Sequence, residues 1–293
     1  MTPRLVVALL VCALLSSGLS ACGHEDDRHV TRDPDAPAQY VALGDSYTSA
    51  PGVPRTVEEG CFRSDSNYPS LVADELNLTL DDVSCGGAAT TALVGVQETA
   101  TGPKPPQFDA LTKDTELVTL GIGGNDEALF GGLLAQCLEL GKKQTTGSPC
   151  RDLMNAGGPD TISTTISVIR GRITSALLGI QDRAPHADVV LVGYPQLVPS
   201  RVRCDALPLA AGDYAYFREV MIELGQATAQ AAADAKTKYV DLLAASEGHD
   251  VCAGDEAWIS GAVSDPERPG VAMHPFAEEQ EAVADLVVEA LED

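Results

Sequence analysis

The stretch YVALGDSY, residues 40–47, decides how this chain folds. Its first half is a short apolar run typical of a buried strand, and its second half is a Gly-Asp-Ser turn. The stretch LVTLGIGGND, residues 117–126, has the same form, with an apolar run that ends in glycines and polar side chains. Two buried strands that each end in a polar turn indicate a sheet whose polar residues gather at one edge.

On either side of these two stretches, apolar patterns typical of strands alternate along the chain with patterns typical of helices. Strands are expected at 39–43, 80–84, 117–122, 188–193 and 239–242, and helices from a cap at Ser66 or Asn67, up to Leu140, and over 160–184, 214–235 and 275–291. Alternation of this kind predicts parallel strands covered on both faces. We therefore predict one α/β domain over residues 39–293, a three-layer α/β/α sandwich whose reactive groups follow the carboxyl ends of the strands.

Composition limits the classes of ligand. The chain has 293 residues, of which 44% are hydrophobic, and its 43 acidic against 19 basic side chains give a formal net charge of -24. Nucleic-acid binding needs clustered Lys and Arg to neutralise phosphates, so no nucleic-acid partner is expected. No stretch beyond residue 25 is apolar over the roughly 18 residues that a membrane-spanning helix needs.

The first residues differ from the rest. Arg4 precedes an apolar segment, residues 5–15, of the length found in secretory signals. The sequence Leu-Ser-Ala-Cys at 19–22 resembles a bacterial lipobox, which predicts a signal peptide over 1–21 and a lipid on Cys22. The polar segment 22–38 reads as a flexible tether. We expect export and attachment to the outer face of a membrane, with an ordinary signal peptide and a secreted protein as the alternative.

Cysteine usage agrees with export. Removing Cys12 with the signal and Cys22 as the lipid site leaves an even number, which suits an oxidising compartment. Of the 15 possible pairings, neighbours in order are favoured because each would close one long loop. The expected disulfides are Cys61-Cys85, Cys137-Cys150 and Cys204-Cys252. No CxxC spacing occurs, so no metal site is expected.

Four segments hold candidate functional residues. Ser46 follows the first strand, a Gly86-Gly87-Ala88 turn follows the second, Asn125 follows the third, and His274 precedes the last helix. Each signal alone is weak, because such residues also form ordinary turns, helix caps and loop histidines. Their order within one α/β domain is the stronger observation.

The four segments together resemble the SGNH hydrolases, the GDSL esterase and lipase superfamily, in its secreted actinobacterial branch. The resemblance implies a flavodoxin-like five-stranded sheet and hydrolysis of carboxylic esters with no cofactor. It also implies that Ser46 is the nucleophile and His274 the base, because a serine hydroxyl needs a base to take its proton. The implied oxyanion hole comprises the backbone N–H groups of Ser46 and Gly87 and the side-chain amide of Asn125.

One position departs from the family pattern. The aspartate expected three residues before the histidine is replaced by Val271. Asp265 and Glu267 are close in sequence, but the prolines and glycine between them and the histidine restrict their approach to the ring. We expect the backbone carbonyl of Val271 to orient the histidine, which gives a Ser/His dyad in place of a triad.

The expected function is that of a monomeric, lipid-anchored extracellular esterase or lipase acting on small-molecule or lipid esters. Two other enzymatic outcomes stay open, deacetylation of a cell-envelope glycan and acyl transfer, because one acyl-enzyme can react with water or with an alcohol. An inactive surface-binding lipoprotein on the same fold is the non-enzymatic alternative.

Overall fold

A computed structural model describes residues 39–158, 161–199 and 203–292 and contains a five-stranded parallel sheet. All five strands lie where the sequence predicts them. They are β1 (Tyr40–Gly44), β4 (Leu80–Asp82), β7 (Leu117–Gly121), β8 (Asp188–Val192) and β9 (Lys238–Val240).

The order of the strands locates the site. Across the sheet the order is β4-β1-β7-β8-β9, which is the flavodoxin-like arrangement. The chain turns to opposite sides after β1 and β7, and Gly44 and Gly121 are register partners at the carboxyl ends of these two strands. Ligands of such sheets bind beside this switch point.

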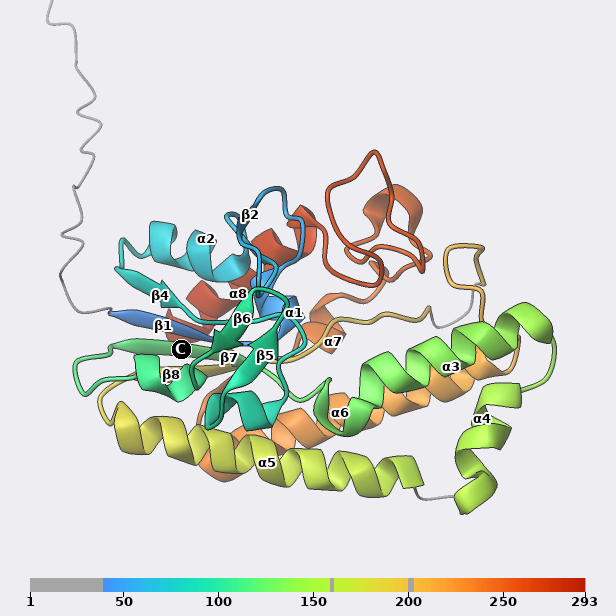
Figure 1. The fold of residues 1–293 in the computed structure, drawn as a ribbon, viewed down its shortest axis with the longest axis horizontal. Helices are drawn as coiled ribbons and strands as arrows, with labels where there is room; N and C mark the ends of the chain where they lie inside the picture. The colour runs from blue at the N-terminus through green and yellow to red at the C-terminus, as the bar shows by residue number, and fades with distance from the viewer. Residues whose placement is uncertain (1–38, 159–160, 200–202, 293) are drawn as a thin grey trace, which may run out of the picture. The chain divides into compact units, whose positions relative to one another are not determined.

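Helices cover both faces, as the three-layer prediction requires (Figure 1). α2 (Tyr68–Glu75) and α8 (Ala277–Glu292) pack on the face that carries Tyr40 and Ala42. α5 (Thr161–Arg183) and α6 (Asp213–Ala235) pack on the opposite face, against Val41 and Leu43. Every residue of β1 and β7 is buried because both faces are covered, which explains their continuous apolar sequences.

Further helices and two hairpins complete the described part of the chain. Further helices are α1 (Ser46–Ser49), α3 (Leu129–Lys143), α4 (Pro149–Met154) and α7 (Leu242–Ala245). The 3₁₀ helices are η1 (Thr90–Leu93), η2 (Gln107–Ala110), η3 (Asp126–Ala128), η4 (Asn155–Gly157) and η5 (Gly254–Glu256). Two hairpins that were not predicted from the sequence are formed by β2 (Thr56–Glu58) with β3 (Arg63–Ser64) and by β5 (Gln97–Thr99) with β6 (Gly102–Lys104).

The three predicted disulfides, Cys61-Cys85, Cys137-Cys150 and Cys204-Cys252, are confirmed. The first joins the loop after β2 to the end of the segment that follows β4. The second joins α3 to α4. Disulfides of this number suit an exported protein.

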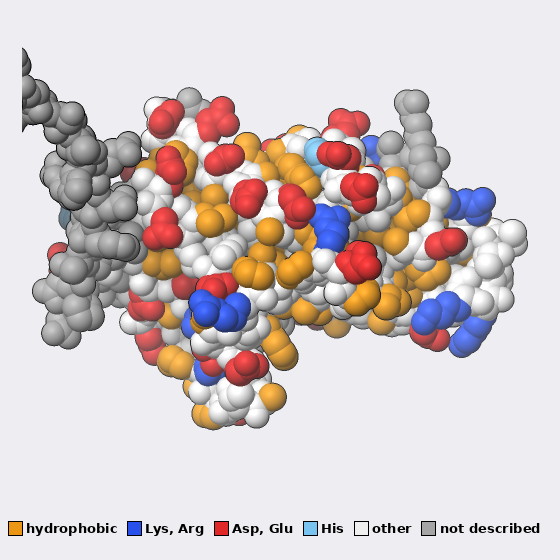
Figure 2. All heavy atoms as spheres, turned by 90° about the horizontal axis from the view of Figure 1, so that it is seen from above, with side chains coloured by type: hydrophobic (Ala, Val, Ile, Leu, Met, Phe, Trp, Pro, Cys, Tyr) orange, Lys and Arg blue, Asp and Glu red, His pale blue; other side chains and the backbone are white. Residues whose placement is uncertain are grey.

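The signal peptide, the tether and Cys22 lie outside the described residues. Within the described part of the chain, no helix is long and apolar enough to cross a membrane. Figure 2 shows that acidic side chains are spread over the face carrying α2 and α8, with basic side chains in only a few places.

Candidate active site

Ser46 is the first residue of α1, immediately after β1. The carboxylate of Asp45 caps this helix by accepting a hydrogen bond of 2.9 Å from the backbone N–H of Tyr47. Gly44 allows the close approach that this turn needs, because a Cβ there would lie 2.7 Å from the carbonyl oxygen of Gly121. The sharp turn therefore sets Ser46 at the switch point of the sheet.

His274 lies in the loop before α8. This loop is fixed by an isolated bridge between Ile259 and Pro275 and by the hydrogen bond of 3.0 Å from the Ser260 N–H to the His274 carbonyl. The imidazole Nδ1 lies 2.8 Å from the Ala272 carbonyl oxygen, to which it donates. Burial lowers the pKa of His274 below its ordinary value, and the Ala272 hydrogen bond partly offsets that effect. The neutral form, which accepts a proton at Nε2, is thus favoured.

The prediction that the Val271 carbonyl orients His274 is wrong, because the Ala272 carbonyl takes this place. The Val271 carbonyl accepts hydrogen bonds from the His274 backbone N–H at 3.0 Å and from the Ser260 hydroxyl at 2.5 Å. Met273 adopts a left-handed conformation with φ 61°, and this turns the chain so that Ala272 faces the ring.

Asp265 and Glu267 do not contact the histidine. Both are exposed, and the Asp265 carboxylate accepts the backbone N–H of Glu267 at 2.8 Å. Among the described residues neither carboxylate hydrogen-bonds to His274. A carbonyl of the main chain is therefore the group that fixes the ring.

Asn125 follows β7 at the same edge. One N–H of its side-chain amide donates to the Ala88 carbonyl at 3.0 Å, which leaves the second donor of the amide for another acceptor. Gly87 sits in the adjacent turn with φ 76°, a left-handed conformation that favours glycine. This turn is held to the Cys61 loop, since the Gly86 N–H donates to the Cys61 carbonyl at 2.8 Å.

A cavity of about 170 Å³ brings three of the predicted residues together. Ser46, Asn125 and His274 all line it, whereas Gly87 lies outside its lining on an exposed turn. No hydrogen bond joins the Ser46 hydroxyl to His274 in the part of the chain that the structure describes; such bonds often shorten only once substrate is bound. The apolar side chains of the lining are Phe130, Leu134, Leu197, Phe217 and Met273.

Sequence reasoning missed Tyr194 and Gln107. The Tyr194 hydroxyl donates to the Asp45 carboxylate at 2.5 Å and accepts the Gly124 N–H at 2.8 Å. The Gln107 amide binds both backbone groups of Gly44, at 2.8 and 2.9 Å. Tyr194 follows the carboxyl end of β8, the same signal that selected Ser46 and Asn125, so it could have been found.

Burial raises the pKa of Asp45 to about 7, against the opposing effect of the hydrogen bonds from Tyr194 and Tyr47. The negative charge of the nearby Asp126 also raises it. The ionised form of Asp45 is the one that accepts both hydrogen bonds. The cap of α1 thus contains a group that titrates near neutral pH.

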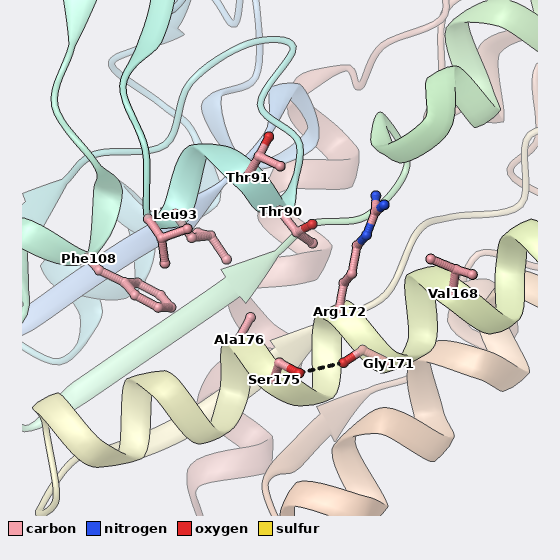
Figure 3. A pocket seen from close by; sticks show the side chains of 10 residues that line it. Thr90, Thr91, Leu93, Phe108, Val168, Gly171, Arg172, Ser175 and Ala176 are labelled. Carbon is pink, nitrogen blue, oxygen red and sulfur yellow. Dashed lines mark hydrogen bonds between the residues drawn. The ribbon is translucent and has the colours of Figure 1, made fainter.

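Asp126 connects the Asn125 loop to η1 and α5. Its buried carboxylate accepts the Thr90 backbone N–H at 2.9 Å and the Thr90 hydroxyl at 2.5 Å, and it forms an ion pair of 2.9 Å with Arg172. Arg172 also pairs with Glu127 at 2.6 Å. Figure 3 shows this arginine rising from α5 beside a second hollow, of about 410 Å³, which none of the predicted site residues lines.

Comparison with known proteins identifies the family. The sequence profile of the GDSL-like Lipase/Acylhydrolase family matches residues 42–281, a region that contains Ser46, Asn125 and His274. The chain belongs to this family. Lipase 2 of Streptomyces coelicolor is 40% identical over 238 residues, which cover 76% of this chain and 78% of the lipase. An esterase of Streptomyces scabiei is 32% identical over 275 residues, covering 79% and 77% of the two chains.

Solved structures agree with these relatives. The phospholipase A1 of Streptomyces albidoflavus superimposes with a TM-score of 0.67 at 27% identity, covering 87% of this chain and all of the phospholipase. An extracellular lipase of Streptomyces rimosus gives a TM-score of 0.69 at 25% identity, covering 86% and 99%. The GDSL-family protein described here is an ester hydrolase of the actinobacterial branch, and its substrates are esters.

Proposed function

We propose that this GDSL-family hydrolase cleaves carboxylic esters through an acyl-enzyme on Ser46. The observation that carries the proposal is the meeting of Ser46, Asn125 and His274 on one cavity, although they are distant in sequence. Neutral His274 takes the hydroxyl proton as the serine oxygen attacks the ester carbonyl, and then gives it to the leaving alcohol. Water activated by the same imidazole hydrolyses the acyl-enzyme.

The proposed oxyanion hole comprises the backbone N–H groups of Ser46 and Gly87 and the amide of Asn125. The second N–H of Asn125 is available beside the cavity because the first is held by Ala88. Preorganised neutral donors stabilise the charge that develops on the ester oxygen. The turn at Gly87 supports the proposal because a left-handed glycine presents its backbone without a side chain.

The cavity indicates the class of acyl group. At about 170 Å³ it is smaller than the roughly 300–1,000 Å³ of pockets that enclose drug-sized ligands. Its lining beyond Ser46 is mainly aromatic and aliphatic. We therefore propose short to medium acyl chains, carried on small-molecule or lipid esters.

Turnover of a graded series of p-nitrophenyl esters, from acetate to palmitate, tests the function. We expect the shorter chains to be favoured, and Ser46→Ala to abolish turnover while leaving the fold intact, because only a hydroxyl that lines the cavity is removed. Absence of turnover in the wild-type protein would favour a binding lipoprotein. If an alcohol is added and most of the acyl groups are recovered as esters of that alcohol, the protein is an acyltransferase and not mainly a hydrolase.

The proposed location is the outer face of a membrane, anchored through a lipid on Cys22. The lipobox at 19–22, the polar segment that follows it and the three disulfides support this proposal. Incorporation of labelled fatty acid that Cys22→Ala abolishes is expected. Incorporation that persists in this variant, or none in the wild-type protein, would overturn the anchor.

A further inference from the structure

We propose that Tyr194 is a positioning residue for ester hydrolysis, whose hydroxyl holds the nucleophile turn and the oxyanion loop at a fixed separation. The inference rests on the catalytic roles proposed above for Ser46 and Asn125. Tyr194 itself does not line the cavity, so it acts through its neighbours and touches no substrate.

The evidence is a two-bond bridge between the residues that immediately precede the two catalytic groups. The Tyr194 hydroxyl donates to the Asp45 carboxylate at 2.5 Å, and its oxygen accepts from the Gly124 N–H at 2.8 Å. Asp45 comes directly before Ser46, and Gly124 directly before Asn125. All three members of the bridge are buried, so water does not substitute for either bond at low cost.

The tyrosine ring is itself fixed from three sides. Tyr47 and Phe130 contact it edge to face, with ring centroids 5.3 and 5.1 Å away. A Cβ on Gly124 would lie 3.0 Å from the ring carbon that bears the hydroxyl, so the backbone passes directly beside it. A rigid ring transmits the position of one loop to the other.

The bridge also depends on the ionisation of Asp45. Tyr47 and Tyr194 face its carboxylate with donors, and Asp126 faces it with a like charge. If the Asp45 oxygen that accepts from Tyr194 were protonated, the carboxyl hydrogen and the Tyr194 hydroxyl hydrogen would both lie between the same two oxygen atoms. Protonation of Asp45 removes the charge-assisted hydrogen bond from Tyr194 and weakens the bridge, which couples catalysis to the pKa of Asp45, about 7.

The decisive variant is Tyr194→Phe, which removes the hydroxyl and keeps the ring. Displacement of about 1 Å at a reacting group can cost roughly 100-fold in rate, so we expect kcat to fall about 10- to 100-fold with KM changed less than about threefold. The matched control is Tyr216→Phe on α6, whose buried hydroxyl has no hydrogen-bond partner among the described residues. The control should keep the wild-type kcat.

The concentration of active enzyme in each preparation is measured as the amount of serine that a phosphonate labels, and kcat is calculated from that concentration. Misfolded protein therefore does not lower the apparent kcat. The value of kcat is then measured from pH 5 to 9. The acid limb of wild-type kcat should have its midpoint near 7, from Asp45, and in Tyr194→Phe it should move to lower pH, where the lowered pKa of His274 sets it. A loss of thermal stability with unchanged kcat and an unmoved acid limb would mean that Tyr194 is only structural, and would overturn the proposal.

Measuring Ser46→Ala in the same series distinguishes failure of the proposed catalytic role of Ser46 from failure of the positioning role of Tyr194. If Ser46→Ala retains turnover, the proposed function fails. If Ser46→Ala is inactive and Tyr194→Phe matches the wild-type protein, only the positioning role fails.

Discussion

At the scale of single residues, the most consequential contact is the one between His274 and a neutral acceptor. The Ala272 carbonyl fixes the tautomer by accepting from Nδ1 at 2.8 Å, as a carboxylate does in a triad. It has no full negative charge with which to stabilise the imidazolium, and burial opposes that charge as well. Burial therefore lowers the histidine pKa, and the hydrogen bond to the Ala272 carbonyl offsets this effect only in part.

Neutralising the nearby carboxylates should therefore change little. We expect Asp265→Asn and Glu267→Gln each to lower kcat less than about tenfold, whereas loss of a true triad acid costs about 10⁴. His274→Ala should be as severe as Ser46→Ala. A thousandfold loss in either carboxylate variant, with circular dichroism unchanged, would show that a side chain supports the histidine after all.

Sequence reasoning reaches the functional side chains but not the backbone that holds them. Ser46 and Asn125 are predictable because each follows a buried strand in a recognisable block. The choice of Ala272 over Val271 depends on the left-handed φ of 61° at Met273, and methionine carries no signal for that conformation. The bond between Tyr194 and Asp45 joins residues 149 positions apart, and no local pattern reports it.

At the scale of elements, the Cys61-Cys85 disulfide has a position that the other two lack. Cys85 directly precedes the Gly86-Gly87 turn, and the Cys61 carbonyl accepts the Gly86 N–H. This crosslink should therefore hold one proposed oxyanion donor in place. The Cys137-Cys150 disulfide joins α3 to α4 and makes no such contact.

Removing either disulfide should lower the stability of the fold, but only removal of Cys61-Cys85 should lower kcat. The double variants Cys61→Ala/Cys85→Ala and Cys137→Ala/Cys150→Ala should each lower the free energy of unfolding by about 2–4 kcal/mol. With an acetyl ester, kcat should fall at least about tenfold in the first and less than about twofold in the second. Equal kcat values in the two variants would remove the proposed link to the Gly87 turn.

The strands of the sheet and the helices α5 and α6 were predictable because their apolar residues form recognisable runs or helical repeats. Five apolar runs and the helices over 160–184 and 214–235 correspond to β strands, α5 and α6 with shifts of one or a few residues at their ends. The two hairpins were not predicted because their strands, with the sequences TVE, RS, QET and GPK, lie in polar segments without an apolar run. Such segments cannot be distinguished from turns by their hydrophobic pattern.

At the scale of the whole molecule, the sequence predicts the class of fold but not the shape of the cavity. The sheet order follows from alternating strands and helices, whereas the apolar lining combines Phe130, Leu197, Phe217 and Met273 from four separate segments. The buried Glu279 of α8 was not predicted either, since it lies in a run of acidic residues that read as solvent-exposed.

Glu279 makes stability depend on pH. Burial raises its pKa to about 8, so the folded state holds the proton more tightly than the unfolded state, and the free energy of unfolding should fall as pH rises from about 4.5 to 8. Denaturant unfolding at pH 6 and pH 9 should show a smaller fall in Glu279→Gln than in the wild-type protein. The exposed neighbour Glu281→Gln is the control, and an equal fall in all three proteins would contradict the assignment.

Covalent labelling by a serine-directed phosphonate shows directly whether Ser46 is the nucleophile. The folded wild-type protein should gain one adduct, and peptide mapping should place it on Ser46, because His274 activates that hydroxyl in particular. Ser46→Ala and the protein unfolded in urea should gain none. An adduct on any other serine, or no adduct on an enzyme that turns over esters, would contradict the account.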